Sequence, residues 1–316
     1  MKKHALLGRR PLRLRPGKDE KKGSEPRAFL PLAERPGGTR PATLMNLPIG
    51  VLDSGVGGIS VLIEISKLMP AEKIIYFGDT ANVPYGSKSP AFIRGAVFEI
   101  LKFFKQQKVK AVVMACNTSS AIVLDKARRC FDFPIIGVIE PGVREALKTM
   151  KTDKALLFAN SVTVESGMHN KIMQSLSEGR ASVVGKACPD FVPLVESGIF
   201  EGQEAERIVN KYMSDFDGID SDTLILGCTH YPFLEKPIKK AAAGRFRIIN
   251  PARATAEELQ KTLRENESEN ISGLRPSHKF YVSGSTEKFR ETASVLMNED
   301  IGEVRKMSLT FSHREA

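Results

Sequence analysis

The sequence predicts an α/β protein with two similar domains, each built from a parallel sheet flanked by helices. The chain of 316 residues is too long for one small domain, and its 41% hydrophobic content is enough for buried cores. From residue 48 onward, short apolar runs alternate with stretches of helical period, which is typical of βα units in a parallel sheet. The alternation starts again near Lys154, so we expect a second sheet of the same kind.

The first set of elements begins with the apolar run Ile49–Leu52 and a Gly-rich turn. A stretch of helical period follows and ends before Pro70, because proline cannot continue a helix. Two more pairs of strand and helix come next, and a fourth strand closes the set. We expect strands over 49–52, 74–77, 111–115 and 135–139, and helices over 59–68, 91–107 and 118–130.

The second set of elements repeats this order and returns to the first sheet at its end. We expect strands over 155–158, 182–184, 224–226 and 280–282, and helices over 163–175, 201–214 and 286–297. The pairs Pro141-Gly142 and Asn250-Pro251 are candidate crossings between the domains. The first domain is therefore expected to comprise 47–139 and 254–310, and the second domain 140–253.

The positive charge of the chain is concentrated at its N-terminal end. The formal net charge is +10, and residues 1–44, with 12 basic and 4 acidic side chains, account for +8 of it. This segment is rich in Pro, Gly and Arg and lacks hydrophobic periodicity, so we expect residues 1–46 to be a disordered basic leader. Translation starting at Met45 is the alternative. The nearly neutral remainder argues against nucleic acid as a partner, and a basic nucleic-acid-binding protein remains the alternative of another class.

The four cysteines exclude several classes of protein. They stand far apart without a CxxC pair, which argues against a zinc site or a dithiol redox centre. Four cysteines in this length are too few for a disulfide scaffold, which favours a reducing, cytoplasmic location. No apolar run approaches the roughly 18 residues that a membrane span needs, so no membrane association is expected.

Two of the cysteines follow predicted strands in matching contexts. Cys116 precedes Asn-Thr after one apolar run, and Cys228 precedes Thr-His after another. Ligands of open parallel sheets bind beyond the carboxyl ends of the strands. A helix N-terminus there favours thiolate, so we expect the pKa of these thiols to be lowered. Cys130 and Cys188 are interpreted as buried structural residues, because cysteine is among the most buried residue types.

Six segments carry a resemblance to a known family, in the family's order and over residues 47 to about 298. They are IGVLDSGVGGIS, FGDTANVPYGS, CNTSS, GVIEPG, CPDFVPLVESG and LGCTHYPF. Together they resemble the cofactor-independent aspartate/glutamate racemase family, in its glutamate branch. The resemblance implies a flavodoxin-like fold for each domain, an active site at the interdomain cleft, and interconversion of L- and D-glutamate for peptidoglycan synthesis. It also implies a homodimer and neither cofactor nor metal.

The resemblance further implies a two-base mechanism, in which one cysteine thiolate removes the α-proton and the other thiol returns a proton to the opposite face. It assigns catalytic roles to Cys116, Cys228, Asp53, His230 and Glu196. It assigns substrate binding to Asp53, Ser54, Pro84, Tyr85, Gly86, Asn117, Thr118, Thr229 and His230. A turn or cap role for Asp53 and an exposed helix-end position for Glu196 remain the alternatives.

The chain departs from the family pattern at three places, and its motifs allow two competing interpretations. The chain has Ala159-Asn160-Ser161, Met168-His169 and Asn250-Pro251-Ala252 where the family commonly has other residues. Aspartate racemization would use the same cysteines. The Gly-rich segment Asp53–Gly58 before a helix is also compatible with a phosphate cradle, but it lacks the complete GK[ST] and GxGxxG patterns.

Overall fold

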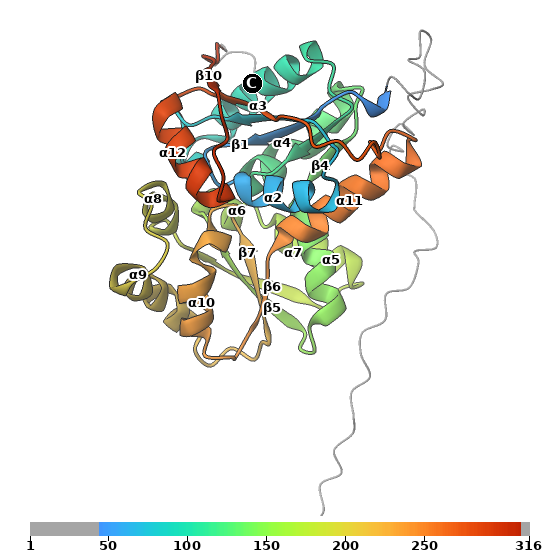
Figure 1. Cartoon of the computed structure of the whole chain (residues 1–316). Coiled ribbons are helices and arrows are strands. Elements are labelled where there is room, and N and C mark those ends of the chain that lie inside the picture. The colour runs from blue at the N-terminus through green and yellow to red at the C-terminus, as the bar shows by residue number, and fades with distance from the viewer. Residues whose placement is uncertain (1–43, 311–316) are drawn as a thin grey trace, which may run out of the picture.

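The computed structural model describes residues 44–310 and contains two parallel sheets (Figure 1). The strands of the first sheet are β1 (Ile49–Asp53), β2 (Ile74–Gly78), β3 (Ala111–Met114), β4 (Ile135–Gly137), β9 (Lys279–Val282) and β10 (Val304–Lys306). Those of the second sheet are β5 (Lys154–Ala159), β6 (Ser182–Ala187), β7 (Thr223–Gly227) and β8 (Arg247–Ile249). We call each sheet with the helices packed on it the first and the second domain.

The first four strands of each sheet are arranged in the same order. The first sheet runs β10-β9-β2-β1-β3-β4 and the second β6-β5-β7-β8, with every neighbouring pair parallel. In both, the strand that comes first in the chain lies between the second and the third, which is the flavodoxin-like order. The predicted fold class is therefore confirmed.

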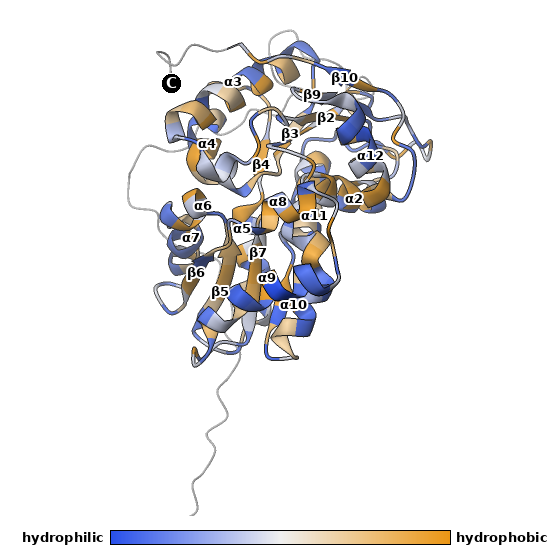
Figure 2. Ribbon diagram, turned by 90° about the vertical axis from the view of Figure 1, so that its left-hand side faces the viewer, coloured by the Kyte–Doolittle hydropathy of each residue, from blue (hydrophilic) through white to orange (hydrophobic). Residues whose placement is uncertain are grey.

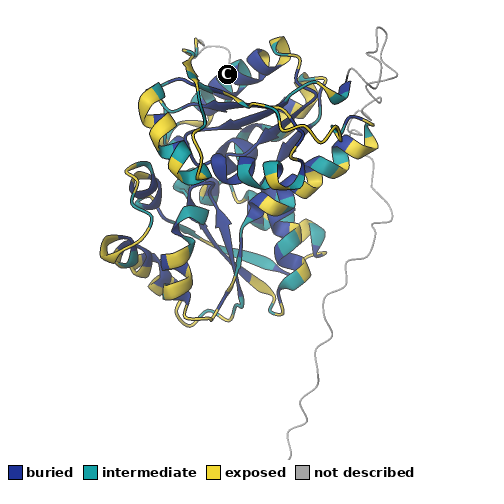
Figure 3. Ribbon diagram, viewed as in Figure 1, coloured by how far each residue is buried: buried dark blue, intermediate teal, exposed yellow. Residues whose placement is uncertain are grey.

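Helices cover both faces of each sheet, and this explains why the strands read as continuous apolar runs. On the first sheet lie α2 (Ile59–Leu68), α3 (Pro90–Gln106), α4 (Asn117–Cys130), α11 (Pro251–Glu265) and α12 (Thr286–Met297). On the second sheet lie α5 (Ile139–Thr149), α7 (Met168–Leu176), α8 (Phe191–Glu196), α9 (Gln203–Met213) and α10 (Glu235–Ala242). The central strands are hydrophobic (orange in Figure 2) and buried (dark blue in Figure 3), whereas the edge strands β6 and β10 and the outer helix faces are more exposed.

Short elements complete the chain at the loops beyond the strands. They are α6 (Ser161–Glu165) and the 3-10 turns η2 (Tyr85–Ser87), η3 (Ser214–Phe216) and η4 (Tyr231–Leu234). The chain crosses between the domains at the start of α5 and at the start of α11. There Gly142 packs closely against Pro251: a Cβ on Gly142 would lie only 2.9 Å from the proline Cγ.

Several element predictions are wrong in detail. The predicted helix 163–175 is two helices, because Gly167 has a φ of +62° that interrupts the helix between α6 and α7. The predicted strand 135–139 ends at Gly137, and Ile139 already belongs to α5. The helices α5, α8, α10 and α11 and the strands β8 and β10 were not predicted. The predicted domain boundary at 253/254 falls inside α11, whose apolar side chains from Ala252 to Leu263 pack in the core of the first domain.

The leader prediction falls mostly on residues 1–43, which lie outside the described residues. Its last part is wrong, because Leu44 is buried and accepts a hydrogen bond from the Leu47 N–H. Behind it, the buried Lys110 Nζ donates to the carbonyl oxygens of Met45 (3.0 Å) and Ser268 (2.7 Å). The same ammonium forms an ion pair with Glu72 (2.6 Å). Residues 44–46 are therefore part of the first domain.

Candidate active site

The predicted site residues come from the carboxyl ends of corresponding strands in the two domains. Asp53 ends β1 and Asn160 follows β5, the first strand of each sheet. Cys116 follows β3 and Cys228 follows β7, the third strand of each sheet. In this strand order the chain turns to opposite sides after the first and third strands, which opens a crevice between their ends. The two crevices lie at the interface of the two domains.

Asp53 contacts the second domain directly. The Thr229 hydroxyl donates to Asp53 Oδ1 (3.0 Å), and the Gly55 N–H donates to Oδ2 (3.0 Å). The carboxyl is completely buried, and burial raises its pKa, opposed by the charge of His230 and by these two donors. The Gly55 bond is the turn contact expected of an aspartate at a strand end, and the Thr229 bond adds a link between the domains.

Thr118 makes the corresponding link in the opposite direction. The Asn160 Nδ2 donates to Thr118 Oγ1 (2.6 Å), and Asn160 Oδ1 caps α6 by accepting from the Thr163 N–H (3.0 Å). In each of the two links, a residue at the end of the first strand of one domain is hydrogen-bonded to a threonine that follows the third strand of the other domain. Asn160 was not predicted as a site residue, although its position directly after β5 corresponds to that of Asp53 at the end of β1.

Cys116 occupies the N-cap position of α4 and is 5% exposed. Its Sγ lies 3.9 Å from the Ser54 hydroxyl. Burial raises the pKa of the Cys116 thiol to about 11, and the Asp53 carboxylate adds to the rise. The predicted lowering of this pKa is therefore wrong, because the loss of water around the sulfur outweighs the hydrogen-bonding Ser119 at the start of the helix. The charge of Cys228 also raises the pKa of Cys116. The two thiols therefore interact electrostatically.

Cys228 has a different set of neighbours. His230 Nδ1 lies 3.8 Å from Cys228 Sγ, and His230 Nε2 lies 2.7 Å from Glu196 Oε1. Burial alone would lower the pKa of His230, but hydrogen bonds and charges from Cys228 and Glu196 raise it well above its usual value. Burial also opposes ionisation of Glu196, yet His230 and the Val56 N–H lower its pKa. Glu196 ends α8 with a side chain that is 19% exposed, so its interpretation as an exposed surface residue is wrong.

The glycines of the segment after β1 allow the two domains to approach closely. A Cβ on Gly55 would lie 2.5 Å from Glu196 Oε1, and one on Gly57 would lie 2.4 Å from His230 Nδ1. Both distances are below van der Waals contact, so a side chain at either position would push the second domain's side chains away. The Val56 N–H donates to Glu196 (3.2 Å), so this N–H is engaged with a carboxylate of the second domain.

The predicted loop of Pro84, Tyr85 and Gly86 lies next to the Thr118 link. A Cβ on Gly86 would lie 2.6 Å from Asn160 Cβ, so the loop packs directly on the second domain. The Tyr85 hydroxyl donates to Asp79 Oδ2 (2.6 Å), and its ring is buried. The Tyr85 hydroxyl is therefore engaged inside the first domain.

A narrow cavity of about 10 Å³ reaches Cys228 and Thr229 from the first domain, where Asn117 lines it. Within the described chain, Asn117 Oδ1 is buried without a hydrogen-bond partner. A cavity of this size holds about one water molecule. A substrate the size of an amino acid therefore reaches Cys228 by this route only after the walls have moved apart.

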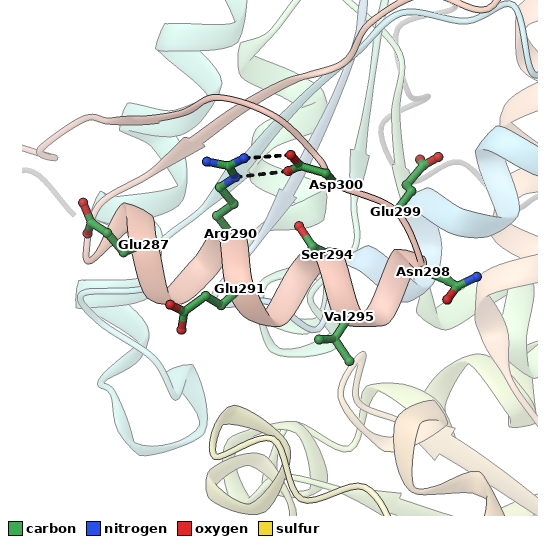
Figure 4. Close-up of a pocket in the computed structure, with 8 residues that line it drawn as sticks. All are labelled: Glu287, Arg290, Glu291, Ser294, Val295, Asn298, Glu299 and Asp300. Atoms are coloured by element: carbon green, nitrogen blue, oxygen red, sulfur yellow. Dashed lines mark hydrogen bonds and ion pairs between the residues drawn. The ribbon is translucent and has the colours of Figure 1, made fainter.

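A larger cavity of about 720 Å³ lies on the outer side of α12 (Figure 4). An ion pair between Arg290 and Asp300 crosses it, with distances of 3.1 and 2.7 Å, and Val295 is exposed beside it. None of the predicted site residues lines it. It is an open groove on the surface, away from the predicted site residues. The small cavity reaches Cys228, Thr229 and Asn117 but is not lined by Cys116.

The two remaining cysteines differ from each other. Cys188 is completely buried in the core of the second domain, as expected, whereas Cys130 at the end of α4 is exposed, so its interpretation as a buried filler is wrong. Over residues 44–310, no cluster of three or more His, Cys, Asp or Glu side chains is arranged to hold a metal ion.

Comparison with known proteins places the chain in a family. The model of the Asp/Glu/hydantoin racemase family matches residues 49–259. The glutamate racemase of Lysinibacillus sphaericus is 37% identical over 265 residues, which cover 84% of this chain and 100% of the relative.

Solved structures agree with this assignment. The glutamate racemase of Bacillus anthracis has a TM-score of 0.80 and 37% identity, covering 84% of this chain and 98% of that one. The glutamate racemase of Francisella tularensis, solved in complex with D-glutamate, has a TM-score of 0.78 and 32% identity over the same shares. The chain belongs to the Asp/Glu/hydantoin racemase family.

Proposed function

We propose that the protein is a glutamate racemase, which interconverts L- and D-glutamate by proton transfer between the α-carbon and two cysteines, Cys116 and Cys228, without a cofactor. The observation that carries this proposal is the position of the two thiols. They follow corresponding strands of two domains of the same topology, and they are close enough for Cys228 to raise the pKa of Cys116. The glutamate racemases described above support the choice of substrate.

The reaction requires one proton to leave and another to arrive on opposite faces of the α-carbon. A thiolate takes the α-hydrogen as a proton, so that the Cα–H bond breaks and an S–H bond forms. The other thiol gives its proton to the opposite face of the carbanion and becomes a thiolate. The two cysteines thus exchange protonation states in each turnover. Because the α-carbon is a very weak acid, both groups must be held close and aligned, with water excluded.

The two thiols have different neighbours. His230, held by Glu196, lies beside Cys228 and supplies a positive charge opposite a thiolate that forms there. Cys116, with a pKa raised to about 11, is a neutral thiol at physiological pH. In the direction in which Cys228 removes the α-proton, Cys116 is therefore the proton donor.

Substrate binding is assigned to groups at the interface. The hydroxyl of Ser54 and the amide of Asn117 lie at the two cysteines, and Thr118 and Thr229 form the links between the domains. Their donors stabilise the substrate carboxylates and the charge that develops during proton abstraction. The buried carboxyl of Asp53, beside these donors, receives the substrate ammonium or orients the thiols.

The biological setting is proposed from the family. D-Glutamate would serve peptidoglycan synthesis in the cytoplasm, and the protein would act as a homodimer. In the part of the chain that the structure describes, no helix has the length and apolar character to cross a membrane. Size-exclusion chromatography with light scattering measures the oligomeric state, and a monomer at assay concentration would contradict the dimer.

The activity is tested with purified protein and L-glutamate in the absence of added cofactor. We expect the optical rotation to fall to zero as the racemic mixture forms. Aspartate is assayed in parallel at the same concentrations, and a kcat/KM for aspartate equal to or above that for glutamate would contradict the substrate assignment. Constant optical rotation with both amino acids would refute the function itself.

A further inference from the structure

Tyr76 on β2 is completely buried beneath the segment that joins Asp53 to α2. Its ring packs against Phe280 and Phe289, with centroids 6.1 and 5.6 Å away. Its hydroxyl donates to the carbonyl oxygen of Gly55 over 2.7 Å. Gly58 makes room for this hydroxyl, because a Cβ there would lie 2.7 Å from the phenol oxygen. Tyr76 therefore fixes one particular peptide group of the active-site segment.

That peptide group connects the first domain to the neighbours of Cys228. The carbonyl oxygen of Gly55 accepts from Tyr76, and the N–H of the same peptide, carried by Val56, donates to Glu196 Oε1 over 3.2 Å. Glu196 Oε1 in turn lies 2.7 Å from His230 Nε2, and His230 Nδ1 lies 3.8 Å from Cys228 Sγ. A continuous chain of contacts thus runs from the phenol to the thiol. Hydrogen bonds in such chains polarise one another, so a donor at the carbonyl strengthens the N–H on the other side.

We propose that Tyr76 is a positioning residue that acts through the Gly55–Val56 peptide to hold Glu196 and His230 against Cys228. The assignment of Cys228 as a proton-transfer group rests on the proposed racemase function, whereas the chain of contacts does not. The hydrogen bonds of this chain of contacts do not include Cys116, whose own hydrogen-bonding neighbours are Ser54 and Ser119.

The ionisable groups around the phenol determine its role. Burial raises the pKa of Tyr76 well above its usual value, and the charges of Asp53, Glu196 and Cys116 add to the rise. The hydroxyl therefore stays protonated and remains a donor at physiological pH. A residue that never ionises can tune its neighbours only through its hydrogen bond, and this bond can be removed by a single substitution.

The test is the variant Tyr76→Phe, which keeps the ring and its aromatic contacts and removes the donor. The measured quantity is the pH midpoint of alkylation by iodoacetamide at each cysteine, followed by mass spectrometry of the peptides. We expect the midpoint of Cys228 to move upward by about half a pH unit or more, with that of Cys116 unchanged. We also expect kcat to fall roughly five- to tenfold, with little change in KM. Tyr212→Phe is the matched control, because Tyr212 is also buried and donates to Asp190 (2.5 Å) away from the chain of contacts.

Two further variants separate positioning from a general loosening of the structure. In a Glu196→Gln background, Tyr76→Phe should move the Cys228 midpoint by less than half as much, because its path to His230 has lost its charge. Replacing the Val56 amide by an ester, by incorporating the α-hydroxy analogue of valine, removes the N–H and should reproduce the Cys228 shift with Tyr76 in place.

The outcomes are separable from those of the activity assay, because alkylation needs no turnover. An unchanged Cys228 midpoint in Tyr76→Phe, equal shifts at both cysteines, or an undiminished shift in the Glu196→Gln background would each overturn the proposal. If the alkylation results hold but glutamate is not racemized, the proposed function fails and the positioning role of Tyr76 remains.

Discussion

The two domains present their cysteines at the same place in the same topology but surround them with different groups. Cys116 has Ser54 at 3.9 Å and a pKa raised to about 11 by burial, whereas Cys228 has His230 at 3.8 Å with Glu196 behind it. The strand order alone would make the two sites equivalent. The topology therefore gives the two thiols equivalent positions, whereas the loops and the short helix α8 give them different hydrogen-bonding and charged neighbours.

The two hydrogen bonds that link the domains also lie at corresponding positions but involve different groups. Asp53 accepts from Thr229, and Asn160 donates to Thr118, at corresponding positions in the two sheets. One link contains a buried carboxyl and the other an uncharged amide. We therefore expect substitutions of the groups around the two thiols to have unequal effects.

Loss of either thiol should have the largest effect. Cys116→Ser and Cys228→Ser are each expected to lower kcat by at least about 10³-fold, because a serine hydroxyl is far too weak an acid to exchange protons with the thiol opposite. Polarimetry with both enantiomers measures the loss. Cys130→Ser is the control, since Cys130 is exposed at the end of α4. Full activity in either of the first two variants would contradict the two-base assignment.

Loss of the charged neighbours should separate the two cysteines. Glu196→Gln is expected to lower kcat/KM about 10- to 100-fold, because the pKa of His230 falls when its carboxylate partner is removed and the Cys228 thiolate loses its counter-charge. Ser54→Ala, the corresponding change beside Cys116, should cost less than tenfold. A larger effect of the serine substitution would reverse the proposed difference between the sites.

The uncharged link between the domains should matter for binding more than for chemistry. Asn160→Ala removes the donor to Thr118 and the cap of α6, and we expect KM for glutamate to rise about five- to tenfold with a smaller change in kcat. Steady-state kinetics measures the two constants separately. A fall in kcat with unchanged KM would place Asn160 with the proton-transfer groups instead.

The smallest effect on activity is expected at a buried histidine of the second domain. Burial lowers the pKa of His169 to about 4, and within residues 44–310 neither ring nitrogen has a hydrogen-bond partner. The pKa of His169 in the folded protein therefore lies below the value near 6.5 of the unfolded chain. Above pH 6.5 this difference does not reduce the free energy of unfolding, but as the pH falls toward 4 the unfolded state binds the proton more tightly and stability is lost.

His169→Met removes this titration. We expect the variant to be more stable than the wild type by about 1–3 kcal/mol at pH 5, with a smaller gain at pH 7 and unchanged kcat. Urea unfolding at the two pH values measures the difference. A gain that is the same at both would show that the titration of His169 plays no part.

Much of the fold could be predicted because its pattern is local. The buried strands β1, β3 and β7 are continuous apolar runs, and the polar residues at their ends marked the positions of Asp53, Cys116 and Cys228. The helix α11 was missed although Asn250-Pro251 is a typical helix start, with the asparagine as cap. The residues after it contain many charges, and these conceal the apolar face that packs on the first domain.

The long-range contacts of the site, within and between the domains, could not be read from the sequence. Glu196 and His230 are 34 residues apart, and the pairs Asp53–Thr229 and Thr118–Asn160 join segments of different sheets. The pKa of Cys116 was predicted in the wrong direction because a strand end next to a helix indicates a dipole but not the extent of burial. Electrostatics at a buried thiol depends on what the opposite domain covers, and no local pattern contains that information.

The account rests on two thiols acting on opposite faces of one α-carbon, and the first turnovers in D2O test this most directly. Purified protein is incubated with unlabelled L-glutamate, and both enantiomers are isolated at low conversion and analysed by mass spectrometry. We predict that nearly all of the D-glutamate carries deuterium at Cα, delivered by the second thiol, while the remaining L-glutamate stays unlabelled. D-Glutamate that retains the original hydrogen would show that a single base removes and returns the proton, and would contradict the account.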